Sequence, residues 1–138
     1  MSVDTVGEAG DSATQLDDLD EDLRVQVVTK AAAALADPVR LRILWLLREK
    51  GELTVGSLTE AVPVSQPRVS VHLRCLTDCG YTEVRREGRR SFYRLATPEI
   101  GGLLDRLTAH AAGSVDGLLA CLACTPDGEP TTDGAGCC

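Results

Sequence analysis

The chain has 138 residues, of which 43% are apolar and 25% charged, a composition typical of one globular domain with short extensions. No apolar run approaches the roughly 20 residues that span a bilayer, and the N-terminus lacks the basic, apolar and small-residue order of a secretory signal. These features exclude a membrane protein, and we expect the chain to be cytoplasmic.

The formal net charge of −7 is unevenly distributed along the chain. Residues 1–22 contain eight acidic residues and no Lys or Arg, so the remaining residues carry a net charge of +1. Residues 65–95 hold seven arginines against three acids. An acidic N-terminal segment therefore masks a basic region that is suited to a polyanion.

The first part of the chain predicts a disordered tail followed by two helices. Residues 1–16 are acidic and show no apolar period, which is typical of disorder. A domain over residues 17–124 then begins with a helix whose apolar residues recur at helical spacing as far as Leu35. Asp37 and Pro38 provide the cap and the first-turn proline of a second helix, which Gly51 ends.

The middle of the chain predicts two further helices separated by a tight break. Thr54 can cap a short helix that extends to residue 62. Ser65 can cap a longer helix over residues 66–78, and Gly80 follows it as a stop. The apolar residues of this longer helix fall on one face, namely Val69, Leu73 and Leu76.

The last part predicts a β-hairpin and a long helix. Residues 81–86 and 90–95 alternate as strands do and are joined through a glycine turn. Thr97, Pro98 and Glu99 form a helix start, and this helix runs towards residue 122 with a bend or break near Gly113. Residues 125–138 are predicted to be a flexible tail that contains cysteines. The predicted fold is mainly α with a small β-hairpin wing, a winged helix-turn-helix.

The third helix and the hairpin together indicate DNA binding. A recognition helix docks through an apolar face and presents short polar groups and arginine to the major groove. The candidate groove residues are Ser65, Gln66, Arg68, Ser70 and His72. The hairpin clusters arginines that can contact backbone phosphates, namely Arg85, Arg86, Arg89 and Arg90. An arginine-rich hairpin alone is more often a solvated surface, and His72 alone could be a metal ligand, but the combination favours DNA.

Sequence-specific binding by one small winged domain normally requires two copies on half-sites about one helical turn apart. The first and last long helices are rich in Ala and Leu and flank the DNA-binding segment in sequence. We therefore expect a homodimer that uses these helices, bound to double-stranded operator DNA.

Three segments resemble the ArsR/SmtB family of metal-responsive repressors. They are residues 34–44 (ALADPVRLRIL), residues 65–73 (SQPRVSVHL) and residues 87–93 (EGRRSFY), which match the opening motif, recognition helix and wing of that family. The resemblance implies a homodimeric winged-helix repressor that leaves its operator when metal binds. Residues 75–80 (CLTDCG) further resemble the cadmium- and lead-sensing CmtR type, whose third cysteine ligand lies where Cys121 lies here, with Cys124 nearby.

The cysteines themselves predict a site for a soft metal ion. Cys75 and Cys79 are four residues apart, so they share one helix face, and a further sulfur from Cys121 or Cys124 can complete the site, in a dimer from the other subunit. Three thiolates suit lead(II), cadmium(II), arsenic(III) or mercury(II), and four would suit zinc. Among these ions, the resemblance to the CmtR type implies cadmium or lead. Binding would tie the recognition helix to the end of the dimer and release the operator.

Other interpretations remain open at this point. The thiols could form a redox switch on the same fold, although cysteines four apart on a helix point poorly for a disulfide. A thiol-rich metal buffer without a DNA role is disfavoured by the arginines. No nucleophile, base and acid set or phosphate loop is evident, so we do not expect an enzyme.

Overall fold

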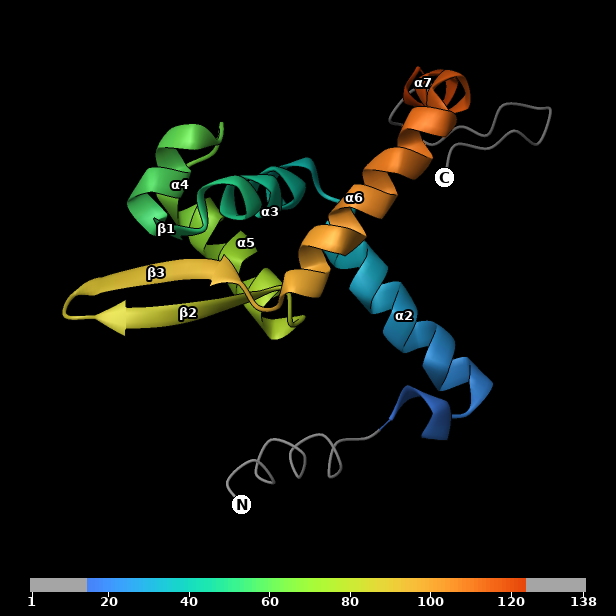
Figure 1. Cartoon of the computed structure of the whole chain (residues 1–138), viewed down its shortest axis with the longest axis horizontal. Helices are drawn as coiled ribbons and strands as arrows, with labels where there is room; N and C mark the ends of the chain where they lie inside the picture. The colour runs from blue at the N-terminus through green and yellow to red at the C-terminus, as the bar shows by residue number, and fades with distance from the viewer. Residues whose placement is uncertain (1–14, 124–138) are drawn as a thin grey trace. The chain divides into compact units, whose positions relative to one another are not determined.

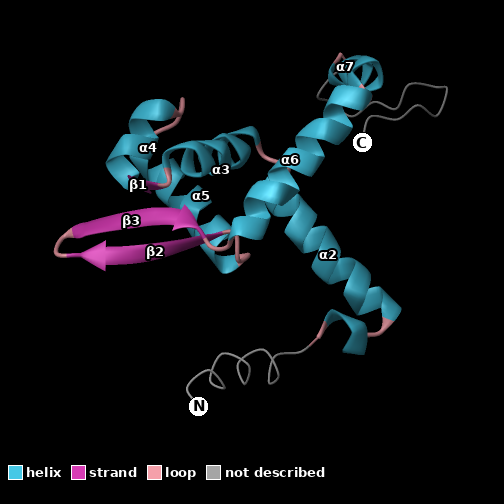
Figure 2. Cartoon of the chain, in the orientation of Figure 1, coloured by secondary structure: helices cyan, strands magenta, loops and turns pink. Residues whose placement is uncertain are grey.

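A computed structural model describes residues 15–123 and divides the chain into two compact units that meet between Ala96 and Thr97. Residues 1–14 of the predicted N-terminal tail (residues 1–16), the predicted C-terminal tail (residues 125–138) and Cys124 lie outside the described residues, so their assignment stays a prediction. Within residues 15–123, no helix combines the length and apolar character needed to cross a membrane. Figure 1 shows the elements by position in the chain and Figure 2 by type.

The first unit begins with a short 3-10 turn, η1 (Leu16–Asp18), and the helices α2 (Glu21–Leu35) and α3 (Pro38–Lys50). The Asp20 carboxylate accepts the backbone amide of Leu23 and caps α2. Asp37 caps α3 by accepting the amides of Val39 and Arg40 at 2.8 and 3.0 Å, and Pro38 occupies the first turn. The predicted start of the second helix is therefore confirmed.

The helix-turn-helix follows as α4 (Val55–Ala61) and α5 (Gln66–Asp78). Thr54 caps α4 by accepting the amide of Ser57, as the sequence predicts. Ser65 is the N-cap residue of α5, but its side chain makes no capping hydrogen bond. Three helices bury the core of this unit, which is formed by Ile43, Leu44, Leu47, Leu58, Val69, Leu73 and Leu76, each at most 1% exposed.

The wing is a three-stranded antiparallel sheet in the order β1-β3-β2, made by β1 (Glu52–Thr54), β2 (Thr82–Glu87) and β3 (Arg90–Leu95). The turn between β2 and β3 projects away from α3 and α5 (Figure 1). The predicted hairpin is confirmed, whereas β1 was not expected from the sequence. Three residues are too few to show an alternating pattern, and β1 exists because its residues pair with residues 92–94 of β3.

The second unit contains α6 (Pro98–Gly113) and α7 (Val115–Leu122). The predicted interruption near Gly113 is confirmed, because the two helices meet at Ser114. Ile100 and Leu104 of α6 are buried, whereas α7 has no buried residue.

Candidate DNA interface and thiol site

Helix α5 has one buried face and one exposed face. Val69, Leu73 and Leu76 are fully buried, which fixes the rotation of the helix about its axis. The opposite face is solvent-exposed and carries side chains able to hydrogen-bond, together with one valine: Gln66, Arg68, Ser70, Val71 and Arg74. Ser65 at the N-cap is also exposed. Val71 and Arg74 were missed by sequence reasoning, although their spacing from Leu73 and Leu76 places them on this face.

A groove of about 520 Å³ lies between the first turns of α4 and α5 and the turn of the wing. Its lining includes Ser57, Gln66, Arg89 and Arg90. Arg89 and Arg90 are exposed, and no carboxylate in residues 15–123 lies within ion-pair distance of either. Two uncompensated guanidinium groups beside helix N-termini suit the binding of phosphate.

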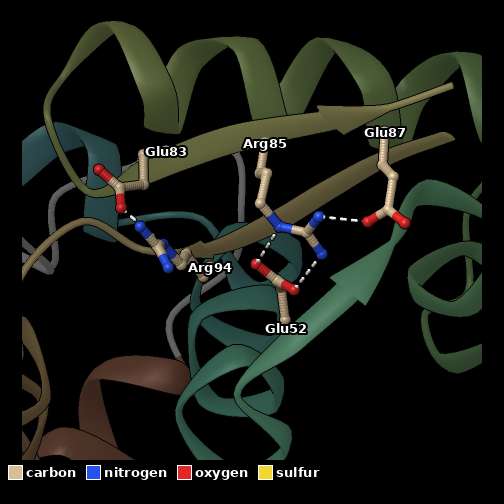
Figure 3. A network of polar contacts seen from close by, with 5 residues as sticks. All are labelled: Glu52, Glu83, Arg85, Glu87 and Arg94. Carbon is tan, nitrogen blue, oxygen red and sulfur yellow. Dashed lines mark hydrogen bonds and ion pairs between the residues drawn. The ribbon is translucent and has the colours of Figure 1, made fainter.

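Arg85, by contrast, is paired with carboxylates of the wing itself (Figure 3). Its guanidinium donates to the two carboxylate oxygens of Glu52 at 2.8 and 3.2 Å and to Glu87, and lies 4.6 Å from the centre of the Phe92 ring. The hydrogen bond from Arg85 holds the pKa of Glu52 below its usual value. Arg85 therefore joins β1 to β2 within the wing, and its contact with phosphate stays a prediction.

The remaining arginines of the wing divide in the same way. Arg94 donates to Glu83 on the neighbouring strand at 2.6 Å, a second cross-strand pair in Figure 3. Arg86 donates to the hydroxyl of Ser91 at 3.0 Å, and no carboxylate of residues 15–123 lies within ion-pair distance of it. The positive charge of Arg86 is therefore not neutralised by a carboxylate of the described residues, as is also the case for Arg89 and Arg90.

His72 lies in the interior rather than on the exposed face that the sequence suggested. It is only 8% exposed, and its Nδ1 accepts from Arg40 Nη1 at 3.4 Å. Arg40 also donates to the carbonyl oxygens of Ala33 and Ala34 at 3.1 and 2.7 Å. The sequence could not fix the rotation of α5, and the structure places His72 where it links α5, through Arg40, to the end of α2.

Cys75 lies in the last turn of α5 and Cys79 is its C-cap residue, and both are half-buried. The amide of Cys79 donates to the carbonyl of Cys75 at 3.0 Å, and Gly80, whose φ is 82°, follows this cap. The amides of Gly80 and Tyr81 return to Thr77 and Leu76, a Schellman arrangement that fixes the end of the helix.

The environment of Cys79 keeps its sulfur protonated. Burial is the largest cause, and the neighbouring Cys75 adds to it through its charge and a hydrogen bond, so the pKa of the Cys79 thiol is raised. Lys30 of α2 opposes this effect, which places a cation of α2 near the pair. The Tyr81 hydroxyl also donates to the Ala31 carbonyl of α2 at 2.7 Å. The thiol pair thus lies where α5 is tied to α2.

The structure brings together two of the four predicted metal ligands. Cys121 is half-buried on α7 in the second unit, and Cys124 lies outside the described residues. Within residues 15–123, no group of three or more His, Cys, Asp or Glu side chains is placed to hold a metal ion. Two sulfurs do not fill the coordination shell of cadmium(II), lead(II) or zinc(II), so for these ions the pair alone is an incomplete site.

Comparison with known proteins identifies the architecture. The family model described as "Bacterial regulatory protein, arsR family" matches residues 37–84, which include the helix-turn-helix and the thiol pair. A relative from Streptomyces lividans, named "Probable mercury resistance operon repressor", is 41% identical over 96 residues, covering 70% of this chain and 76% of the relative. This chain belongs to the arsR family. It is therefore a DNA-binding regulatory protein and not an enzyme.

Other members of the family support the fold. An arsenic resistance transcriptional regulator of Pseudomonas putida is 41% identical over 73 residues, which cover 53% of this chain and 56% of that protein. A solution structure of a homodimeric winged helix-turn-helix DNA-binding domain from Mycobacterium bovis has a TM-score of 0.62 and 32% identity, over 72% of this chain and 90% of that domain. The winged helix-turn-helix is thus confirmed for this arsR-family chain.

Proposed function

We propose that this protein is a homodimeric repressor that binds operator DNA through α5 and the wing, and leaves it when a soft metal ion is bound by thiolates. The observation that carries the proposal is the position of Cys75 and Cys79 in the last turn of the helix whose exposed face is suited to the major groove. A ligand at one end of a 13-residue helix can change the orientation or rigidity of the other end.

The DNA side of the proposal divides contacts by chemistry. Base edges would be contacted by Arg68 on the exposed face of α5 and by the short polar side chains of Ser65, Gln66 and Ser70. Arg86, Arg89 and Arg90 would bind phosphates, because their charges are not compensated by carboxylates of the described residues. Arg85 and His72 would act indirectly, by holding the wing and α5 in position.

The dimer is supported by exposed apolar side chains on the helices at both ends of the described chain. On α2 they are Leu23, Val25, Val27 and Val28, and on α6 and α7 they are Leu103, Leu107, Val115, Leu118, Leu119 and Leu122. A cleft of about 320 Å³ between α6 and α7 is lined almost wholly by apolar residues. The relative from Mycobacterium bovis is described as homodimeric, which agrees with this arrangement.

The metal would be held by Cys75, Cys79 and a third thiolate from Cys121 or Cys124. The donors fit a soft ion, because thiolates select such ions over magnesium or calcium. We favour cadmium(II) or lead(II), since residues 75–80 resemble the cysteine pattern of the CmtR type. Mercury(II) is the second candidate, because the relative from Streptomyces lividans is named for mercury resistance. Arsenite and zinc(II) are the remaining candidate ions.

A metal titration followed by ultraviolet charge-transfer absorption tests the site. Cadmium, lead, mercury and arsenite are added in turn to the full chain and to the variants C75S, C79S, C121S and C124S. We expect the sulfur-to-metal bands of the effector to be lost in C75S and C79S and in one of the other two. Intact bands in both C75S and C79S would remove the proposed site. A change in thiol count with peroxide, accompanied by release of DNA, would instead support the redox switch.

A further inference from the structure

Val71 is an apolar side chain in an unexpected position. It is 67% exposed, the largest exposed fraction of any large apolar side chain in residues 15–96. Isolated apolar residues on a protein surface need no special explanation. This one, however, lies on α5, on the side opposite the buried apolar residues Val69, Leu73 and Leu76.

The neighbours of Val71 place it in the middle of the face proposed to enter the groove. Arg68 and Arg74 lie three residues before and after it, and Ser70 precedes it, all of them exposed. Val69 and Leu73, two residues to either side, are fully buried and point into the core. Val71 therefore points away from the domain, between two long arginine side chains.

The side chain of Val71 is short, apolar and rigid. A valine in a helix has one strongly preferred χ1 rotamer, so its two methyl groups hold a fixed position without further ordering. Because both Ser70 and Val71 are short, the backbone of α5 can approach the base edges closely at this point. The apolar group that a base pair presents in the major groove is the C5 methyl of thymine.

We propose that Val71 is a specificity-determining residue that contacts the C5 methyl group of a thymine in each operator half-site. The inference rests on the proposed function, in which α5 reads the major groove. It assigns to Val71 a discrimination that differs from that of the polar residues of the same face, because hydroxyl and guanidinium groups recognise hydrogen-bonding groups of the bases and a valine side chain makes only apolar contacts.

Replacement of thymine by uracil tests this contact, since the two bases differ only by the C5 methyl. The probe is a duplex selected by the full-length chain from a randomised pool, in which each thymine is replaced singly by uracil. We expect one position per half-site at which the replacement weakens binding about fourfold, the ratio for losing one buried methyl group. For V71A, which keeps only the Cβ methyl, we expect the preference for thymine over uracil at that position to be smaller than in the wild type.

Two controls keep the outcomes distinct. V71A is expected to fold, because an exposed valine contributes little to stability and alanine favours the helix, and circular dichroism checks this. R90Q should weaken binding to thymine and uracil duplexes equally, because it removes a phosphate contact. The inference is overturned if the wild type shows no sensitive thymine, or if V71A retains the same discrimination. If the full-length chain selects no sequence at all, the proposed operator function fails, and this inference fails with it.

Discussion

The two ends of helix α5 differ in chemistry although they belong to one rigid element. The outward face of the N-terminal two turns is exposed and presents amide, guanidinium and hydroxyl groups. The C-terminal turn holds two half-buried thiols and is fixed by the Schellman turn and by the Tyr81–Ala31 hydrogen bond to α2. One end suits a polyanion and the other a soft cation. Because both ends belong to one helix, binding of a ligand at one end can change the affinity of the other end for its own ligand.

The largest effect is expected from removing a thiol at the C-terminal end. C79S should raise the metal concentration needed to release operator by more than about 100-fold, because it deletes a direct ligand. Operator affinity without metal should stay within about twofold of the wild type, since Cys79 lies outside the exposed face of α5 that we propose to contact DNA. An electrophoretic shift assay with increasing cadmium measures both values. Release of operator from C79S at the same cadmium concentration as from the wild type would contradict the assignment of Cys79 as a metal ligand.

The same end should also make metal binding depend on pH. The pKa of Cys79 is raised by burial and by Cys75, so the thiol is protonated at neutral pH and must lose its proton when metal binds. Each proton released makes apparent affinity rise about tenfold per pH unit below that pKa. Cadmium titrations at pH 6, 7 and 8 in a buffer that does not chelate should show this rise. A flat profile would mean that the Cys79 sulfur is not a ligand.

Two arginines of the wing, Arg90 and Arg85, form a matched pair that tests which side chains bind phosphate. R90Q should lower operator affinity and reduce the slope of log affinity against log salt by about 0.9 for each arginine removed. R85Q should leave that slope unchanged, because Arg85 is already paired with Glu52 and Glu87. Fluorescence anisotropy at several salt concentrations measures the slopes. Equal changes for the two variants would show that pairing within the wing does not distinguish them.

The smallest effect concerns the cap of α3, which positions Arg40 beside His72. Burial of the Asp37 carboxylate acts to raise its pKa, but the hydrogen bond from the Arg40 amide and the nearby Arg40 and His72 outweigh it, so the pKa is lowered. The carboxylate therefore stabilises the fold above the ordinary value of about 4, and this contribution is lost as pH falls through the lower folded value.

Two variants of Asp37 separate the cap from its charge. D37A should reduce the free energy of unfolding by about 1 kcal/mol at pH 7, whereas D37N keeps a good cap and should cost little. Between pH 5 and pH 2, D37N should lose less stability than the wild type, as measured by urea denaturation. The same acid dependence in both proteins would show that Asp37 does not titrate in this way.

Local chemistry made most of the fold predictable. Asp37, Thr54, Gly51 and Gly80 act over a few residues, and the structure places the helix boundaries where these residues imply. The strand β1 was missed because it is defined by pairing with β3, which is distant in sequence. Strands this short owe their existence to a partner and not to their own pattern.

The candidate site was predictable by residue type but not by orientation. Cys75 and Cys79 share a face because of helical geometry alone, and the structure places them together. The inward position of His72 and the internal pairing of Arg85 depend on Arg40, Glu52 and Glu87, which come from other segments. A basic residue in a motif can bind DNA or brace the fold, and only its partners in space decide between the two.

The coupling between the two ends of α5 is tested most directly by the affinity for cadmium with and without saturating operator DNA. Thermodynamic linkage requires operator to weaken cadmium binding by the same factor by which cadmium weakens operator binding. We expect a factor of about 5 to 150, the usual range for allosteric coupling. Equal cadmium affinities in the free and operator-bound protein would contradict the account.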